Sequence, residues 1–291
     1  MTAAGVLRET NESETARAEC PASPIVRRTR GAEVTCGVHQ SATYHRLLGG
    51  AKLVFRRSIN PRFADEEAPG LTAVVADFER RVEHSLRLPE VDPEYARLQA
   101  TWNRRIIGEV FRAATARTPA RDRLLSVGSF YGFAESALSL IYKSVLCADL
   151  KNFLIDPPLN VGFVAADIDS AEWALPDVRY DCIMFVEMLE HLIWSPLPLL
   201  SWMRQHGDRL FITTPDAKEW PNMKPHPWTR LSHFSDIPIA PPGETGNPNP
   251  MEHAKQYAVA EFVELLSTTG WRVERLSRVG NGGHQILLEC T

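Results

Sequence analysis

The sequence predicts an α/β fold in which a doubly wound, mostly parallel sheet ends in an antiparallel C-terminal edge strand. Three observations support this prediction. Short apolar runs alternate with helical patterns from residue 122 onwards, a glycine turn joins the first run to a helix, and polar residues follow the ends of the runs. Because parallel strands end at one edge of a sheet, these polar residues are expected to face a common crevice.

The first run, residues 124–127, ends at Gly128 and passes through Gly132 into a helical pattern. Strand, tight turn and helix in this order bring backbone N–H groups and a helix N-terminus close to a ligand, which suits a nucleotide-like cofactor. The residues of this turn expected to contact the cofactor are Gly128, Ser129, Tyr131 and Gly132.

The next three runs each end at an acidic residue. These are residues 144–148 before Asp149, residues 161–166 before Asp167, and residues 180–186 before Glu187. Asp149 lies 21 positions after Gly128, and its carboxylate can reach a pair of ribose hydroxyls. A fifth run, residues 209–214, stops at Pro215.

Helices are expected before, between and after these runs. Apolar residues recur at helical spacing over residues 71–86, and Asp92 with Pro93 has the pattern of an N-cap followed by proline at the first helical position. After the fourth run, residues 187–194 are expected to begin a helix that Pro196 and Pro198 restrict to a late or kinked start. The expected C-terminal elements are a helix over residues 258–268 and two strands, 271–276 and 284–289, which form the antiparallel edge.

The composition is that of a globular protein. With 291 residues, 44% of them hydrophobic, the chain can form one large domain with appendages. A net charge of -4 offers no general attraction to polyanions, so no nucleic-acid partner is expected. No signal segment or long apolar run is present, so we expect no membrane span and a cytoplasmic location. Five cysteines without CxxC spacing argue against disulfides and structural zinc, and the oligomeric state is left open.

Two strand-end motifs resemble those of the class I S-adenosylmethionine-dependent methyltransferases. They read Tyr180-Asp181 followed by Glu187-Met-Leu-Glu-His-Leu192, and Ile212-Thr-Thr-Pro-Asp216, with a similar C-terminal pattern at 249–257. The resemblance implies a Rossmann-like sheet and S-adenosylmethionine as the cofactor. It places the loop 128–132 at the methionine part, Asp149 at the ribose and Asp167 beside the adenine amino group, with Ile168 and Glu187 completing the cofactor site.

The chain departs from that family in its first motif, which usually begins with an acid and has three glycines. Here the acid is replaced by Ser126 and the middle glycine by Phe130. We expect Phe130 to need an ordinary φ and to bring bulk to the place of the methionine part. The link from Asp149 to Asp167 contains two prolines and leaves space for only a stub of the usual second helix.

We expect three regions along the chain. Residues 1–68 form a partly disordered N-terminal extension, residues 69–118 a helical cover, and residues 119–291 the methyltransferase domain, with an insertion at 216–251. The insertion is rich in proline and aromatic residues. A long irregular segment at the carboxyl edge of a sheet is typical of a functional loop, so it is expected to roof the acceptor pocket.

Methyl transfer to a hydroxyl requires alignment of the acceptor, exclusion of water and a base. His191 is the first candidate for this base, because Glu187, Glu190 and His191 can share one helical turn, and His233 is the second. The structural alternative is that Glu190 and His191 only brace the helix.

The acceptor is expected to be a small hydroxylated molecule, such as a sugar or a secondary metabolite, and no metal is expected to take part. Candidate substrate contacts are Tyr95, Trp102, Arg230 and His253. Core packing is the ordinary alternative for Tyr95 and Trp102. Lys218, Lys224 and Arg230 lie in the insertion and leave a phosphorylated or nucleotide-linked acceptor open.

Two other interpretations stay open. The same motif resembles the metal site of small-RNA 3′-terminal 2′-O-methyltransferases, in which case Glu187, Glu190 and His191 would bind a divalent ion with His226 or His233. Alternatively, the altered first loop could mark a catalytically inactive scaffold that only binds a partner.

Overall fold

The structure is a computed structural model in which residues 70–116, 121–218, 233–247, 252–280 and 283–291 are described. At its centre lies a seven-stranded sheet with the order β3-β2-β1-β4-β5-β7-β6. The strands are β1 (Arg123–Val127), β2 (Ser144–Asp149), β3 (Val161–Ala165), β4 (Cys182–Phe185), β5 (Leu210–Pro215), β6 (Val273–Val279) and β7 (Gln285–Cys290). β1 to β5 run parallel, and β7 lies antiparallel between β5 and β6. The predicted α/β fold with its antiparallel C-terminal edge is confirmed.

The strand order reverses at β1, which has β2 on one side and β4 on the other. Such a reversal opens a crevice at the carboxyl ends of the strands. Val127 of β1 is paired with Ala148 of β2 and with Phe185 of β4, so these strands end at the same level. The residues that follow the three strands are therefore brought together at one edge.

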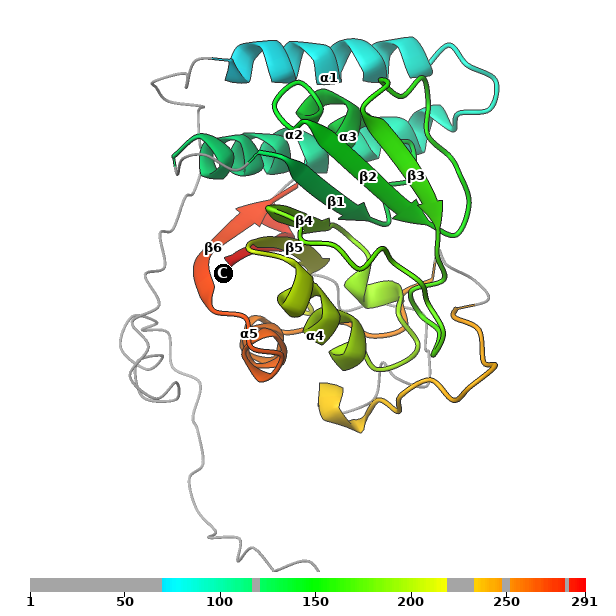
Figure 1. Ribbon diagram of the computed structural model, residues 1–291, viewed down its shortest axis with the longest axis vertical. Coiled ribbons are helices and arrows are strands. Elements are labelled where there is room, and N and C mark those ends of the chain that lie inside the picture. Colours follow the sequence, from blue (N-terminus) through cyan, green and yellow to red (C-terminus); the bar gives the residue numbers. More distant parts are fainter. Residues whose placement is uncertain (1–69, 117–120, 219–232, 248–251, 281–282) are drawn as a thin grey trace, which may run out of the picture. The chain divides into compact units, whose positions relative to one another are not determined.

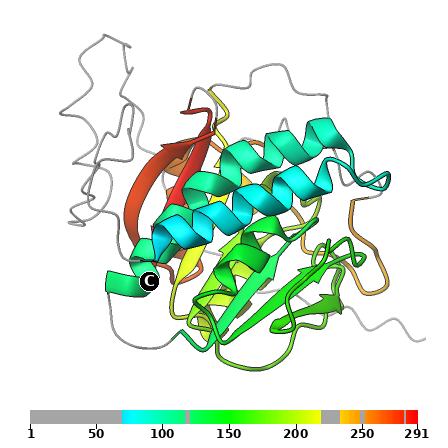
Figure 2. The same ribbon diagram turned by 90° about the horizontal axis from the view of Figure 1, so that it is seen from above.

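Helices cover both faces of the sheet (Figure 1, and from above in Figure 2). The face with α1 (Leu71–Ser85), α2 (Pro93–Ala116) and α3 (Phe133–Leu138) buries one apolar cluster. The face with α4 (Leu197–His206) and α5 (Val259–Thr268) buries the other. Two short 3₁₀ helices, η2 (Leu189–His191) and η4 (Phe234–Asp236), lie in the connections.

The start of α2 agrees with the prediction. Asp92 Oδ1 accepts hydrogen bonds from the N–H groups of Glu94 at 2.9 Å and Tyr95 at 3.1 Å. Pro93 occupies the first helical position, where its missing N–H leaves no helical bond unmade. A cap of this kind typically stabilises a helix by about 1 kcal/mol.

The connection between β2 and β3 follows the prediction, because no helix forms between Asp149 and Val161, a link that the structure describes in full. The connection after β4 follows it in part. Residues 187–194 form only the turn η2 instead of the start of a helix, and α4 begins late, with Pro196 as its N-cap and Pro198 in its first turn. β6 runs three residues further than expected, to Val279 instead of residue 276.

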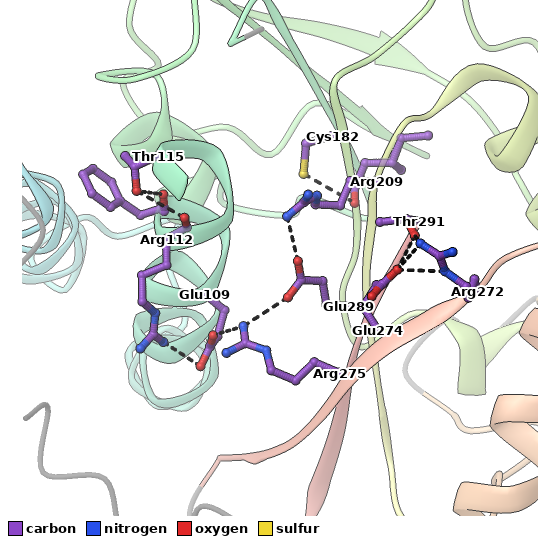
Figure 3. A network of polar contacts seen from close by, with 12 residues as sticks. Glu109, Arg112, Thr115, Cys182, Arg209, Arg272, Glu274, Arg275, Glu289 and Thr291 are labelled. Atoms are coloured by element: carbon purple, nitrogen blue, oxygen red, sulfur yellow. Dashed lines mark hydrogen bonds and ion pairs between the residues drawn. The ribbon is translucent and has the colours of Figure 1, made fainter. Parts of the chain in front are cut away.

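A chain of ion pairs joins the second half of α2 to the antiparallel edge (Figure 3). Glu109 is buried and contacts Arg112 at 2.6 Å and Arg275 of β6. Arg275 lies 3.2 Å from Glu289 of β7, and Arg209 donates to the same carboxylate at 2.7 Å. These contacts join the second half of α2 to β6, to β7 and to the residue before β5.

Several expectations fall partly outside the described residues. Residues 1–69, Lys224, His226 and Arg230 lie outside them, so the N-terminal extension and the roles considered for these three side chains stay predictions. Cys147 of β2 and Cys182 of β4 are buried free thiols. Of the described helices, none combines the length and the apolar character that crossing a bilayer requires.

Candidate functional site

A cavity of about 330 Å³ lies where the strands end beside the reversal of strand order. Its volume is within the range of small-ligand sites. The residues that line it include Tyr95, Gln99, Trp102, Asn103, Gly128, Ser129, Phe130, Glu135, Asp149, Lys151, Phe153, Asp167, Ile168, Asp169, Glu187, Met188, His191, Thr245, Gly246 and Asn247. Most of the residues predicted for the site therefore meet at one cavity.

The turn after β1 needs glycine at its first position. Gly128 has a φ of 77°, and a Cβ there would lie 2.2 Å from Met188 Cγ. Its N–H donates to the carbonyl of Ala148 at 2.8 Å, which ties the turn to β2. Glycine at this position thus leaves room for the Met188 side chain, which packs directly against the turn.

The expectation that Phe130 has an ordinary φ is wrong. Its φ is 46°, in the left-handed region that a glycine would normally occupy. Two contacts hold this conformation: the Phe130 N–H donates to Asp149 Oδ2 at 3.0 Å, and the ring packs between Tyr95 and Phe153 at centroid distances of 5.1 and 4.8 Å. The side chain is therefore drawn into an aromatic group on the cavity wall, and the backbone keeps the shape of a glycine turn.

Tyr131 and Gly132, predicted to bind the cofactor, do not line the cavity. The buried Tyr131 hydroxyl accepts a hydrogen bond from the Asp92 N–H at 3.0 Å, which joins the turn to the start of α2. Gly132 has a φ of 68° and is the N-cap of α3. Both residues shape the turn from behind.

Asp149 and Asp167 lie on the cavity wall beyond β2 and β3. Asp149 accepts N–H bonds from Phe130 at 3.0 Å and Leu150 at 2.7 Å, and burial raises the pKa of its carboxyl. Asp167 Oδ2 accepts from the Gly246 N–H at 3.0 Å. Gly246 approaches so closely that a Cβ there would lie 2.7 Å from Asp167 Oδ1, which brings the insertion over this end of the cavity.

Asp169 is a site residue that the sequence reasoning missed. It is 8% exposed and accepts hydrogen bonds from the N–H groups of Ile193, Trp194 and Asn247 at 2.9 to 3.0 Å. Burial raises its pKa to about 6 even though these donors act in the opposite direction. Asp169 therefore joins the turn before α4 to the insertion.

Glu187 follows β4 in a strained conformation. Its φ is 52°, and its N–H donates to Thr213 Oγ1 of β5 at 2.9 Å. Oε1 is buried and has no hydrogen-bond partner in the described part of the chain, and burial raises the pKa of the carboxyl to about 7. Left-handed non-glycine residues of this kind gather at functional sites.

Glu190, His191 and His253 form a compact group behind Glu187. One ligand atom from each lies within 4.8 Å of the other two, and the two imidazole rings meet edge to face at 4.7 Å. Glu190 is 1% exposed, and neither carboxylate oxygen has a well-formed hydrogen bond from a described residue, although the nearby Thr214 hydroxyl acts to lower its pKa. Burial, with the nearby Glu187, raises its pKa well above the usual range.

His191 is held as a neutral ring. Burial and the neighbouring His253 lower the pKa of His191 to about 4. Its Nδ1 lies 3.3 Å from the carbonyl oxygen of Glu252, and its Nε2 lies 3.9 Å from Glu190 Oε1. A proton on Nδ1 satisfies the carbonyl and leaves the Nε2 lone pair free to accept a proton.

The structure separates His233 from this group. Its ring packs on Phe234, Nδ1 contacts Ser235 Oγ at 2.8 Å, and Nε2 lies 3.3 Å from Glu264 of α5. His233 does not line the cavity, whereas His253 contacts His191 directly. The sequence distances from His191 to His233 and to His253 did not indicate which of the two lies beside it.

Gln99 and Asn103 are further cavity residues that were not predicted from the sequence. They lie on α2 in one stripe with the predicted Tyr95 and Trp102, because all four follow the same helical spacing. Glu135, nine residues after Ser126, faces that serine across the turn. A search for acids near the altered first motif would have found it.

Comparisons with known proteins give similar folds only. No family model and no curated protein matches the chain. Similar solved structures include a methyltransferase from Aquifex aeolicus, at 17% identity over 74% of this chain and 97% of that chain, with a TM-score of 0.44. Magnesium protoporphyrin IX methyltransferase from Synechocystis is 14% identical over 76% and 98%, with a TM-score of 0.47. A Burkholderia thailandensis 1,6-didemethyltoxoflavin-N1-methyltransferase is 16% identical over 78% and 91%, with a TM-score of 0.46.

Proposed function

We propose that the chain is an S-adenosylmethionine-dependent methyltransferase that methylates a hydroxyl of a small acceptor such as a sugar or a secondary metabolite. The observation that carries this proposal is the single cavity shared by the turn at Gly128, the carboxylates of Asp149 and Asp167, and His191. The first three suit a nucleoside cofactor, and His191 suits proton removal from an acceptor.

The residues divide the cavity between the two ligands. Asp167 and Ile168 would hold the adenine, Asp149 the ribose, and the turn at Gly128 the amino-acid end. The stripe of α2, with Tyr95 and Trp102, would receive the acceptor. An aromatic wall excludes water and positions an acceptor by contact area.

S-adenosylmethionine, when bound, supplies a methyl group activated on a sulfonium centre. S-adenosylhomocysteine would leave as the bond between the methyl carbon and the sulfur breaks, and His191 would accept the proton of the acceptor hydroxyl at Nε2. Glu190 Oε1 lies 3.9 Å from this nitrogen and helps to orient the ring. The base is neutral before the reaction because its pKa is low.

The test of cofactor binding is isothermal titration with S-adenosylhomocysteine. We expect the wild type to bind, and Asp149→Asn to bind about 10- to 100-fold more weakly, because a hydrogen bond to a charged group is lost. Asp156→Asn is the matched control, since Asp156 lies on the same β2–β3 link but is exposed. If the wild type binds neither S-adenosylmethionine nor S-adenosylhomocysteine, the enzyme proposal fails and the scaffold interpretation replaces it.

A second candidate function is favoured by the group of Glu190, His191 and His253. We propose as the alternative a divalent-metal-dependent transfer to a hydroxyl, including the 2′-hydroxyl of RNA, in which these three residues hold the ion. Two imidazoles and one carboxylate suit a metal of intermediate hardness, and the unpartnered Glu190 oxygens are available to it. His253 would take the place considered for His226 or His233.

Metal analysis separates the two candidates. Under the first proposal, purified protein dialysed against chelator keeps its turnover, and added Mn²⁺ or Mg²⁺ changes nothing. Under the second, chelation abolishes turnover, one of these ions restores it, and His253→Ala lowers the bound metal measured by mass spectrometry. His84→Ala, on the exposed side of α1, serves as the control.

A further inference from the structure

Glu135 is a buried carboxylate on the cavity wall that the mechanism above does not use. It lies in α3, directly after the turn that begins at Gly128, and is 5% exposed. Ser126 Oγ of β1 donates to Glu135 Oε1 at 2.6 Å. This contact occupies one of the two carboxylate oxygens, and Glu135 is part of the cavity lining.

No positive group compensates Glu135 within the described chain. Desolvation by burial raises its pKa to about 7, and the charged neighbour that contributes is Asp149, another acid. A buried carboxylate without a counter-charge is unfavourable on its own. Its position beside a cavity therefore favours a ligand that brings a positive charge.

The cavity lining as a whole also carries an excess of acidic side chains. Its described lining includes five carboxylates, from Glu135, Asp149, Asp167, Asp169 and Glu187. Lys151 is the one lysine or arginine in this lining. A wall of this kind attracts cations. S-adenosylmethionine carries a sulfonium and an ammonium group, both positive.

The proposed function assigns Asp149 to the ribose and the turn at Gly128 to the amino-acid end. Glu135 lies close enough to Asp149 for their charges to interact, and it belongs to the helix that begins directly after this turn. Resting on the proposed function, we infer that Glu135 binds the ammonium group at this end, with Ser126 holding the carboxylate in position. The chain would thereby supply from α3 a carboxylate that its β1 position, Ser126, cannot supply.

The experiment compares two ligands that differ in the amino-acid end. S-adenosylhomocysteine carries the ammonium group, whereas 5′-methylthioadenosine has the same adenine, ribose and sulfur but no amino acid. Both are titrated calorimetrically into the wild type, Glu135→Gln and Asp149→Asn. Glu135→Gln keeps the size of the side chain and an oxygen for the Ser126 hydroxyl, and its thermal unfolding verifies the fold.

We expect Glu135→Gln to bind S-adenosylhomocysteine about 10- to 100-fold more weakly and to bind 5′-methylthioadenosine as the wild type does. Asp149→Asn should weaken both ligands alike, because both contain the ribose. Equal losses for the two ligands in Glu135→Gln, or no loss for either, would overturn the inference and leave the proposed function standing. A wild type that binds neither ligand would instead overturn the proposed function, and this inference with it.

Discussion

Two buried carboxylates at the same edge of the sheet have opposite surroundings. Asp169 is 8% exposed and accepts hydrogen bonds from the N–H groups of Ile193, Trp194 and Asn247. Glu190 is 1% exposed, and its oxygens accept no well-formed hydrogen bond from the described residues, with the Thr214 hydroxyl as a nearby donor. Burial raises the pKa of both groups, so the difference lies in their donors.

This difference separates a structural acid from a chemical one. Both carboxylate oxygens of Asp169 accept hydrogen bonds from backbone N–H groups, and these bonds link two distant segments of the chain. Glu190 keeps its capacity, and beside it the neutral His191 and His253 also offer lone pairs. A folded chain tolerates such an unsatisfied group where a proton, a cation or a substrate completes it.

The largest expected effect tests whether the group of Glu190, His191 and His253 takes part in the reaction. His191→Ala should lower turnover about 10²- to 10⁴-fold, because a positioned base is lost, while the affinity for S-adenosylhomocysteine stays within about threefold. Release of S-adenosylhomocysteine is measured with the acceptor that a panel of phenols and hexoses identifies. His84→Ala is the control and should keep full turnover. A His191→Ala protein with wild-type turnover would mean that the group around Glu190 only braces the turn.

The second effect is on stability and tests the structural side. Asp169→Asn places an NH₂ group where an oxygen accepts backbone N–H bonds, and should lower the free energy of unfolding by about 2 to 4 kcal/mol. Glu190→Gln should change it by less than about 1 kcal/mol, or raise it, because no hydrogen bond is lost. Urea denaturation at pH 7 measures both. Equal destabilisation by the two variants would break the comparison.

The strand ends that form the site, and the N-cap of α2, could largely be predicted from the sequence. The ends of β1 to β4 were located because apolar runs followed by Gly128, Asp149, Asp167 and Glu187 are local patterns. The N-cap at Asp92 was equally local. These features depend on neighbours within a few residues, so they can be predicted one segment at a time.

The contacts between distant segments could not be predicted in this way. Asp169 obtains its donors from residues 193–194 and from Asn247, and His191 meets His253 across 62 positions. Phe130 adopts a glycine-like φ because its ring is buried against Tyr95 of α2. Tertiary packing decides all three, and neither periodicity nor propensity contains it.

The third expected effect concerns pH and Glu187. Its folded pKa is raised from 4.5 to about 7, so the native state holds a proton that the unfolded chain releases, and the associated stability is lost as pH rises from 4.5 through 7. Glu187→Gln removes this dependence. Relative to the wild type, its free energy of unfolding should therefore gain about 1 to 3 kcal/mol between pH 4.5 and pH 8. Urea denaturation of both proteins at the two pH values measures this difference. If the difference in free energy of unfolding between Glu187→Gln and the wild type is the same at both pH values, the pKa of Glu187 is not raised in solution.

The smallest expected effect uses two adjacent threonines of β5 that are both fully buried. Thr213 Oγ1 accepts the N–H of Glu187 at 2.9 Å, whereas the structure gives Thr214 Oγ1 no hydrogen-bond partner among the described residues. Valine has nearly the shape of threonine without the hydroxyl. Thr213→Val should lower the free energy of unfolding by about 1 kcal/mol, because it leaves a buried N–H unpaired, and Thr214→Val should change it little or raise it. Urea denaturation of the two variants under one condition provides the measurement, and each variant is the control for the other.

An equal loss in Thr214→Val would show that the Thr214 hydroxyl donates a hydrogen bond to a neighbour such as Glu190 in solution. The contrast between Asp169 and Glu190 would then disappear.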